Sequence, residues 1–288
     1  MPTSWSPTVK VAYTTPMTPE AMPATMPATM LAIEPSALDL DAALAELATQ
    51  GIARLGRVLS DEGVAALGGR VEDLLAARVR HEGLFFQRDS PSGRYEDLAF
   101  GKGWQGPSPH YRKLEKLELD PLFRAWIGNA VFERVARALI DGPIALYRAV
   151  LFNKSTAGGT ALPWHQDGGA FWGVDRPPLL QIWTALDDCT VESGCVEALP
   201  GSHRAGLTTP DGGVIPAAAL EAAQAATRAV PFPARAGESM LIHNHLWHRS
   251  GVNTSGHRRS ALSVCFMSAA TRCLRKKRAP RQFVTIFP

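Results

Sequence analysis

Residues 162–173, LPWHQDGGAFWG, place a His and an Asp two positions apart within an apolar stretch. In an extended segment, residues two positions apart point to the same face, so His165 and Asp167 converge while Gln166 points away. An imidazole and a carboxylate on one face can provide two ligands of a metal ion. Taken alone, the pair is equally compatible with a polar surface turn, so its interpretation depends on what else the chain supplies.

A third candidate ligand, His248, follows an apolar run and precedes a turn rich in Gly, Asn and Ser. Two His and one carboxylate form the ligand set of non-haem Fe(II) oxygenases, which leaves coordination positions open for a cosubstrate and O2. A structural zinc site would need a fourth protein ligand. His243 and His245 keep that alternative open, although we expect neither of them to bind iron.

The second half of the chain, about residues 145–268, carries four segments in order: PWHQD, IWTALDD, ESGCVEALPGSH and HRSGVNTSGHRRSAL. Together they resemble the phytanoyl-CoA dioxygenase family of Fe(II)/2-oxoglutarate oxygenases. The resemblance implies a double-stranded β-helix, a jelly roll of the cupin-like type, with flanking helices. It also implies the use of Fe(II), 2-oxoglutarate and O2, with His165, Asp167 and His248 as the iron ligands and catalytic centre.

Arg259 is the residue that the resemblance assigns to the distal carboxylate of 2-oxoglutarate, because it follows His248 at the family's spacing. Strand alternation favours it over Arg258: Arg259 shares a face with small side chains, whereas Arg258 shares a face with bulky apolar ones. A guanidinium offers a carboxylate two parallel, charge-assisted donors. The resemblance also implies cosubstrate contacts from Ser250, Lys154, Gln181 and Trp183.

The reaction that the resemblance implies is hydroxylation of an unactivated C–H bond of a small-molecule substrate, with O2 consumed and succinate and CO2 released. Related halogenases carry Ala or Gly at the position of Asp167, so halogenation is not expected, while desaturation or cyclisation stays open. A non-redox cupin-like metal protein, an isomerase or a binding module, is the alternative. Substrate contacts are expected from Phe171, Trp172, Trp104 and Arg94.

The elements before residue 143 are expected to be helical, over about residues 36–142. Ser60 is a typical N-cap, and apolar residues follow it at helical spacing through residue 75. A second helix is expected to begin at Asp120 and Pro121 and to continue through Val135. The segment 88–111 between them, rich in Gly and Pro, predicts a loop that is either disordered or functional, for example as a lid.

After residue 143, short apolar runs alternate with turn signals through about residue 270. Several short strands without intervening helices predict an antiparallel sandwich or barrel. The expected fold is therefore mainly β with flanking helices (α+β), as one domain over residues 36–288 with a jelly-roll core at 143–270 and a basic tail at 271–288. Residues 1–35, rich in Pro, Thr and Met, are expected to form a disordered leader.

The composition limits the expected partners. The 288 residues carry a net charge of +3, much of it at residues 272–281, so no nucleic-acid partner is expected, and a scaffold role of this tail is the least favoured alternative. No membrane-spanning run and no signal-peptide pattern are present, so a cytoplasmic location without a membrane partner is expected. The four cysteines are expected to be reduced, with a Cys189–Cys195 disulfide left open. No feature specifies an oligomeric state.

Overall fold

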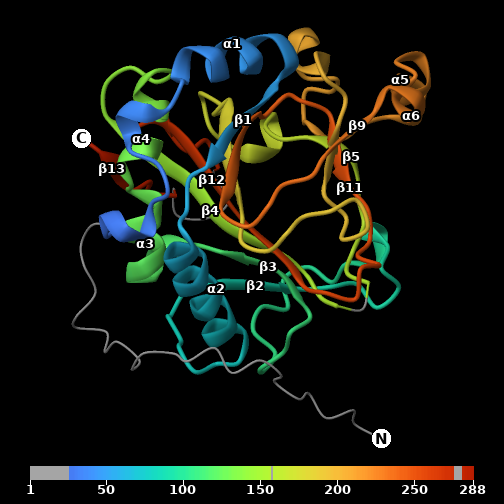
Figure 1. The fold of residues 1–288 in the computed structure, drawn as a ribbon. Coiled ribbons are helices and arrows are strands. Elements are labelled where there is room, and N and C mark those ends of the chain that lie inside the picture. The colour runs from blue at the N-terminus through green and yellow to red at the C-terminus, as the bar shows by residue number, and fades with distance from the viewer. Residues whose placement is uncertain (1–25, 157, 276–280) are drawn as a thin grey trace, which may run out of the picture.

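Two antiparallel sheets form the centre of the structure, a computed structural model that describes residues 26–156, 158–275 and 281–288 (Figure 1). The larger sheet contains, in spatial order, β1 (Ile52–Arg57), β10 (Glu238–His243), β6 (Leu180–Ala185), β12 (Arg259–Ser268), β4 (Ile144–Lys154), β3 (Tyr111–Glu115) and β2 (Phe85–Arg88), and β13 (Thr285–Phe287) pairs with β4. The smaller sheet contains β8 (Gly213–Val214), β5 (Leu162–Gln166), β11 (His248–Ser250), β7 (Val196–Ala198) and β9 (Val230–Phe232). This arrangement confirms the predicted jelly roll.

Helices cover the outer face of the larger sheet. They are α1 (Leu40–Gln50), α2 (Asp61–Leu75), α3 (Pro121–Ile127) and α4 (Ala130–Arg137), while α5 (Ala217–Ala222) and α6 (Ala225–Arg228) lie beside the smaller sheet (Figure 1). One apolar core joins Leu67 of α2 and Trp126 of α3 to Leu262, Val264 and Phe266 of β12. The bulky face of β12 therefore packs outward under the helices, which leaves its small-residue face for the interior.

The space between the two sheets holds a second apolar cluster. Trp183 of β6, Met240 of β10 and Ala261 of β12 pack there against Val196 and Ala198 of β7. Inward and outward side chains alternate along each strand of such a sandwich. Polar side chains at alternate strand positions, on the same face as these apolar ones, consequently point into the interior, where the candidate site lies.

The single helix predicted from residue 120 through residue 135 is two helices in the structure. Gly128 and Asn129 separate α3 from α4. Asn129 caps α4, because its side-chain oxygen accepts a hydrogen bond from the N–H of Phe132 at 3.0 Å. The part of the chain predicted to be helical also supplies β1, β2 and β3, whose partners are strands far along the sequence.

Both ends of the domain differ from the prediction. Met26 and Met30 are buried in the outer core, and Leu31 pairs with Leu59, so ordered packing begins before residue 36. The prediction for residues 1–25 lies outside the described residues. At the other end, β13 pairs with β4 and Phe287 is 3% exposed, so the last residues of the predicted tail join the larger sheet. Residues 276–280 of that tail also lie outside the described residues.

Alanine substitutions at two glycines of α2 would test how the segment before residue 36 packs. A Cβ added at Gly63 would lie 2.3 Å from the carbonyl oxygen of Met30, whereas one at Gly68 would meet no atom within 4 Å. Gly68→Ala should raise the free energy of unfolding by about 0.5–1 kcal/mol, the usual gain in a helix. Gly63→Ala should lower it, because the Met30 backbone must move. Urea denaturation measures both changes, and equal stabilisation by the two variants would contradict the packing of Met30.

Within the ranges that the structure describes, no helix is both long and apolar enough to cross a membrane.

All four cysteines are free thiols: Cys189, Cys195 and Cys265 are buried, and Cys273 is partly exposed.

Candidate active site

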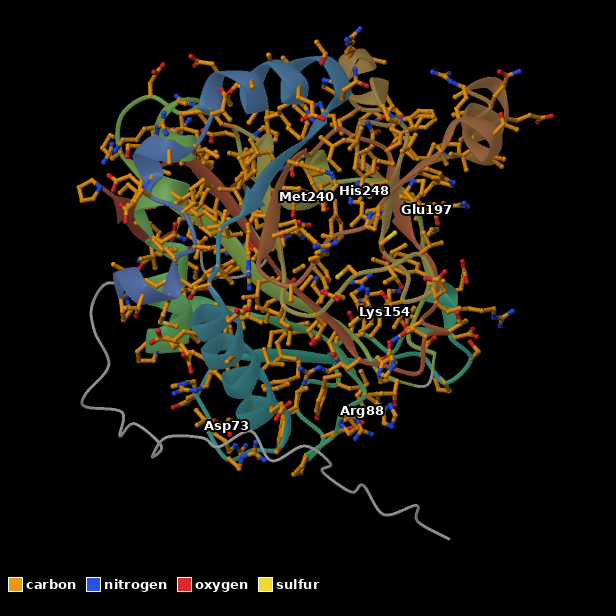
Figure 2. The ribbon with its side chains drawn as sticks, in the orientation of Figure 1. Asp73, Arg88, Lys154, Glu197, Met240 and His248 are labelled. Atoms are coloured by element: carbon orange, nitrogen blue, oxygen red, sulfur yellow. The ribbon has the colours of Figure 1, made fainter. Side chains whose placement is uncertain are left out.

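Two neighbouring strands of the smaller sheet bring the candidate metal ligands together. His165 of β5 and His248 of β11 are direct cross-strand partners, with ring centroids 4.1 Å apart. Asp167 follows β5 directly, and one ligand atom from each of the three side chains lies within 4.8 Å of the others. Figure 2 labels His248 on the smaller sheet and Met240 on the larger one, the two sheets that enclose this site. The spacing of His165 and Asp167 thus produces the convergence that strand alternation predicted.

Local backbone contacts orient both imidazoles. The Nδ1 atoms of His165 and His248 lie 2.8 Å from the carbonyl oxygen of Pro163 and 2.9 Å from that of Leu246. Because a carbonyl only accepts, each Nδ1 carries the proton, and each Nε2 is left with a free lone pair for a metal. Burial, together with the neighbouring His248, lowers the pKa of His165 to about 4. The imidazole is therefore neutral at physiological pH, as metal binding requires.

Asp167 is held from three directions. A guanidinium nitrogen of Arg148 lies 3.1 Å from Oδ1, the amide nitrogen of Gln181 donates to Oδ2, and the backbone N–H of Asp167 donates to the Asn244 carbonyl at 2.8 Å. Burial alone would raise the pKa of this carboxyl, but Arg148 and then the two imidazoles hold the pKa well below its usual range. The group is consequently an anion at physiological pH.

Arg259 and Lys154 form a cationic pair on the inner face of the larger sheet. They are opposite each other in the β12–β4 register and are 3% and 5% exposed. Arg259 donates to the Gly194 carbonyl, its Nε has no acceptor, and no carboxylate within the described residues forms an ion pair with it. Lys154 donates to the Thr160 carbonyl at 2.8 Å. Buried cations without anionic partners are costly, so the pair is suited to an anionic ligand.

The electrostatic cost of burying this pair affects the ionisation of Lys154. Burial, and then the positive charge of Arg259, hold the pKa of the Lys154 ammonium well below its usual range. Figure 2 labels Lys154 together with His248, at separate positions within the sandwich. A carboxylate placed beside Arg259 would offset part of this repulsion.

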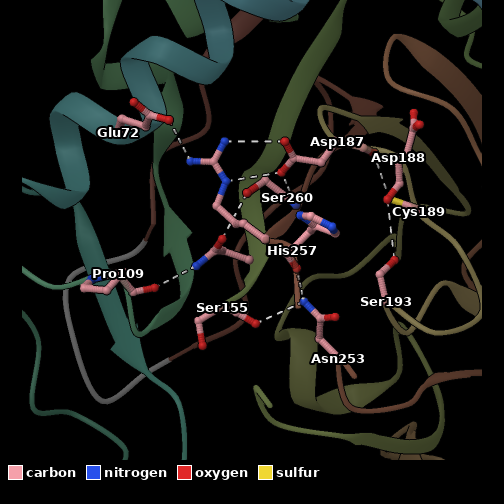
Figure 3. A network of polar contacts seen from close by, with 12 residues as sticks. Glu72, Pro109, Ser155, Asp187, Asp188, Cys189, Ser193, Asn253, His257 and Ser260 are labelled. Atoms are coloured by element: carbon pink, nitrogen blue, oxygen red, sulfur yellow. Dashed lines mark hydrogen bonds and ion pairs between the residues drawn. The ribbon is translucent and has the colours of Figure 1, made fainter. Parts of the chain in front are cut away.

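The neighbouring Arg258 points to the opposite face, as strand alternation predicted. Its guanidinium pairs with Asp187 and with Glu72 of α2, each at 3.2 Å. Asp187 also accepts from the N–H of Ser260 at 2.8 Å, within the network that Figure 3 shows between α2 and the start of β12. These contacts anchor the strand end that carries Arg259.

The other predicted cosubstrate residues lie around the same interior. Ser250 of β11 is buried and pairs with Leu162 of β5 and Val196 of β7. Trp183 faces inward from β6 and packs in the inner cluster. Gln181 faces inward too, but its side chain bonds to Asp167 and accepts from Ser263 at 3.0 Å, so its visible role is to support a metal ligand.

The predicted substrate residues do not all gather at this site. Trp104 packs against Phe86 and Tyr111 on the helix-covered side of the larger sheet, so the structure does not bring it to the triad. The side chain of Arg94 is 70% exposed and pairs with Asp97. Within segment 88–111, Trp104 and Tyr111 pack onto the outer core rather than toward the triad.

The other two predicted substrate residues sit in the loop that follows Asp167. Phe171 is 76% exposed. Trp172 is buried, stacks on Tyr147 with centroids 4.3 Å apart, and lies under the guanidinium of Arg148 at 4.6 Å. Trp172 therefore reaches the surroundings of the triad through Arg148, whereas the side chain of Phe171 points to solvent.

Three further histidines remain apart from the triad. The rings of His203 and His243 are 5.0 Å apart, and those of His243 and His245 are 5.2 Å apart. Across the part of the chain that the structure describes, only His165, Asp167 and His248 form a group able to hold a metal ion. A fourth protein ligand of a structural zinc site is thus not found among the described residues.

The sequence model of the phytanoyl-CoA dioxygenase (PhyH) family matches residues 47–261, which is most of the chain and includes all three candidate ligands. The chain belongs to the phytanoyl-CoA dioxygenase family. The motifs that suggested the resemblance therefore reflect a match that extends well into the N-terminal half, including β1 and α2.

Individual relatives agree with this family. "Phytanoyl-CoA dioxygenase domain-containing protein 1" of Mus musculus is 30% identical over 159 residues, which cover 52% of this chain and 54% of that protein. The chain thus aligns with about half the length of such relatives. EctD from S. alaskensis, solved with 2-oxoglutarate and 5-hydroxyectoine, has a TM-score of 0.65 at 19% identity, covering 88% of this chain and 84% of its own.

A second solved structure with this fold is that of an epimerase. The epimerase SnoN, in complex with Fe3+, alpha ketoglutarate and nogalamycin RO, has a TM-score of 0.62 at 24% identity and covers 85% of this chain and 89% of its own. At these identities the two structures show that they share a fold with this chain, and nothing more.

One residue of the site was not found from the sequence. Arg148 is a lone charged side chain inside the apolar run IALYRAVLF, and that position was the only signal available. Regular pairing from Lys154–Arg259 to Arg148–Cys265 places Arg148 on the same inner face of β4 as Lys154, and the register shift comes only after this stretch. What the sequence did not show is that Asp167, which follows a strand of the other sheet, lies against Arg148.

Proposed function

We propose that the chain is an Fe(II)- and 2-oxoglutarate-dependent dioxygenase that hydroxylates an unactivated C–H bond of a small-molecule substrate, consuming O2 and releasing succinate and CO2. The observation that carries the proposal is a His-Asp-His site on one sheet and, on the inner face of the other sheet, the buried guanidinium of Arg259, whose Nε has no acceptor among the described residues. A metal site alone fits many activities. A carboxylate clamp next to it favours a dicarboxylate cosubstrate.

The side chains present fit the proposed iron and cosubstrate. His165 and His248 offer Nε2, and Asp167 offers an ionised oxygen, which is the facial triad that Fe(II) oxygenases use. Arg259, with Lys154 opposite it on β4, would hold the distal carboxylate of 2-oxoglutarate. When bound, iron with 2-oxoglutarate and O2 supplies the oxidising chemistry, in which the cosubstrate is decarboxylated as the substrate C–H bond is oxidised.

The protein contributes orientation and exclusion of water. Trp164 and Trp172, which flank the His165–Asp167 segment, are 7% and 6% exposed. Trp164 packs in the apolar cluster on the outer side of β5 and Trp172 lies against Arg148, so both exclude water from those sides of the segment. The apolar setting of the two polar ligands is thus consistent with an oxidising centre that must be shielded.

The alternative, a non-redox cupin-like metal protein, explains the triad but not Arg259. An isomerase or a metal-binding module on this barrel needs no buried guanidinium beside the metal. Hydroxylation, in turn, is distinguished from desaturation, cyclisation or epimerisation by the product: only hydroxylation adds one oxygen atom to the substrate, which mass spectrometry detects.

Anaerobic addition of Fe(II) and then 2-oxoglutarate tests the proposal. We expect a weak visible charge-transfer band in the wild type and its loss in His248→Ala, because that variant lacks one of three metal ligands. On admission of O2, the wild type should form succinate. A wild type that binds the metal but shows neither the band nor succinate supports the non-redox alternative instead.

A further inference from the structure

We propose that Arg148 is a positioning residue for Asp167, whose guanidinium holds one carboxylate oxygen and thereby presents the other to the metal. The proposal rests on the proposed function only in taking Asp167 as a metal ligand. It gives a function to Arg148, a buried cation that belongs neither to the His165–Asp167 segment nor to the proposed cosubstrate site.

The two oxygens of Asp167 have different surroundings. Oδ1 lies 3.1 Å from a guanidinium nitrogen of Arg148. Oδ2 lies 3.9 Å from Nε2 of His248 and accepts from the amide of Gln181. The oxygen next to Nε2 of His248 is therefore Oδ2, while Arg148 pairs with Oδ1. A carboxylate held in this way is restricted to binding through one oxygen, which leaves more coordination positions open for a cosubstrate and O2.

Arg148 is itself fixed by several contacts. The nitrogen that pairs with Asp167 also donates to the amide oxygen of Gln181 at 3.2 Å. That oxygen is further held by the hydroxyl of Ser263 at 3.0 Å. Arg148, Gln181 and Asp167 thus form a closed triangle of one ion pair and two hydrogen bonds, in which moving one member disturbs the other two.

The ring of Trp172 supports the guanidinium from another side. The central carbon of Arg148 lies 4.6 Å from the Trp172 ring centroid, and this ring is parallel to that of Tyr147, with centroids 4.3 Å apart. The hydroxyl of Tyr147 donates to the Trp172 carbonyl at 3.2 Å. Since Asp167 and Trp172 belong to one short segment, Arg148 connects both of its ends to β4.

A cation at this place has a competing use, namely to bind an anionic substrate. Two observations favour positioning. The guanidinium already has an anionic partner, Asp167, and its contacts to Gln181 and Trp172 hold it toward that partner rather than toward open space. A substrate-binding role would leave metal binding in the absence of substrate unchanged, so the two roles predict different results.

The test is the affinity for Mn(II) alone, measured by electron paramagnetic resonance of the free ion without cosubstrate or substrate. Arg148→Gln should weaken Mn(II) binding about 10- to 100-fold, the usual effect of removing a group that orients a metal ligand. Arg148→Lys, which keeps the charge but cannot bond to Asp167 and Gln181 in the same way, should cause a smaller loss. The lysine variant also decides the matter if the glutamine variant does not fold.

Arg249→Gln is the matched control. Arg249 pairs with Glu197 at 2.8 Å and lies over the Trp164 ring at 4.9 Å, so it has the same kinds of contact without touching the triad. Its replacement should leave Mn(II) affinity unchanged. Wild-type affinity in folded Arg148 variants would overturn the positioning role. Wild-type protein that binds Mn(II) but forms no succinate would overturn the proposed function alone, and wild type that binds no Mn(II) would overturn both.

Discussion

Arg259→Gln is expected to raise the KM for 2-oxoglutarate by roughly 30-fold to several thousand-fold, equivalent to about 2–5 kcal/mol, while kcat changes little. The reason is that Arg259 is 3% exposed and has no carboxylate partner of its own within the described residues, so under the proposed function the cosubstrate supplies the missing anion. An interaction made equally in the ground and transition states affects KM rather than kcat. Succinate formation as a function of 2-oxoglutarate concentration measures both constants.

Arg258→Gln is the control for this prediction. Arg258 is adjacent in sequence, but it faces α2 and pairs with Asp187 and Glu72. Its loss should lower the free energy of unfolding without raising the KM for 2-oxoglutarate. If Arg258→Gln raised that KM and Arg259→Gln did not, the assignment of the inner face of β12 would be wrong.

Asp120→Ala is expected to lower the free energy of unfolding by about 3–5 kcal/mol, a large part of the total of about 5–15 kcal/mol typical of a domain. Asp120 is fully buried and accepts from Arg70 at 2.6 Å and from His81 at 2.8 Å. It also caps α3 by accepting from the N–H groups of Leu122 and Phe123. The Ala variant would leave all four donors without this acceptor.

Urea denaturation tests the role of Asp120 against an exposed cap of the same type. Asp39 caps α1 by accepting from the N–H of Ala42 at 3.1 Å and has no ion pair among the described residues. Asp39→Ala should therefore cost only about 1 kcal/mol. Asp120→Asn should fall between the two, because the amide oxygen can still cap α3. Equal losses for Asp39→Ala and Asp120→Ala would show that the buried ion pair contributes nothing.

Features that depend on neighbours along the chain were determined by the sequence alone. Strand alternation placed His165 and Asp167 on one face, Gln166 on the other, and distinguished Arg259 from Arg258. In the structure Gln166 indeed bonds away from the site, to the carbonyls of Gly206 and His245. These predictions succeed because the direction of a side chain on a regular strand depends only on its position in the alternation.

The same reasoning holds for helix starts. Ser60 accepts from the N–H of Gly63 at 3.1 Å, and Asp120 caps α3, both as predicted. A cap is a contact across three residues, so its signal is contained in the local sequence. By contrast, apolar spacing did not show that the chain breaks between α3 and α4, because both helices bury the same kinds of side chain.

Tertiary structure alone decided the features whose partners are distant in sequence. Met30 packs against α2, β13 pairs with β4, and Trp104 turns toward the outer core, none of which a local pattern specifies. The ion pair between Arg148 and Asp167 belongs to this group as well. Alternation along β4 places Arg148 on the same face as Lys154, but its contact with Asp167 joins the larger sheet to the smaller one and therefore depends on how the two sheets pack. The ligands of the proposed metal were thus determined by sequence, whereas the contact of one of them with Arg148 was decided by the packing of the two sheets.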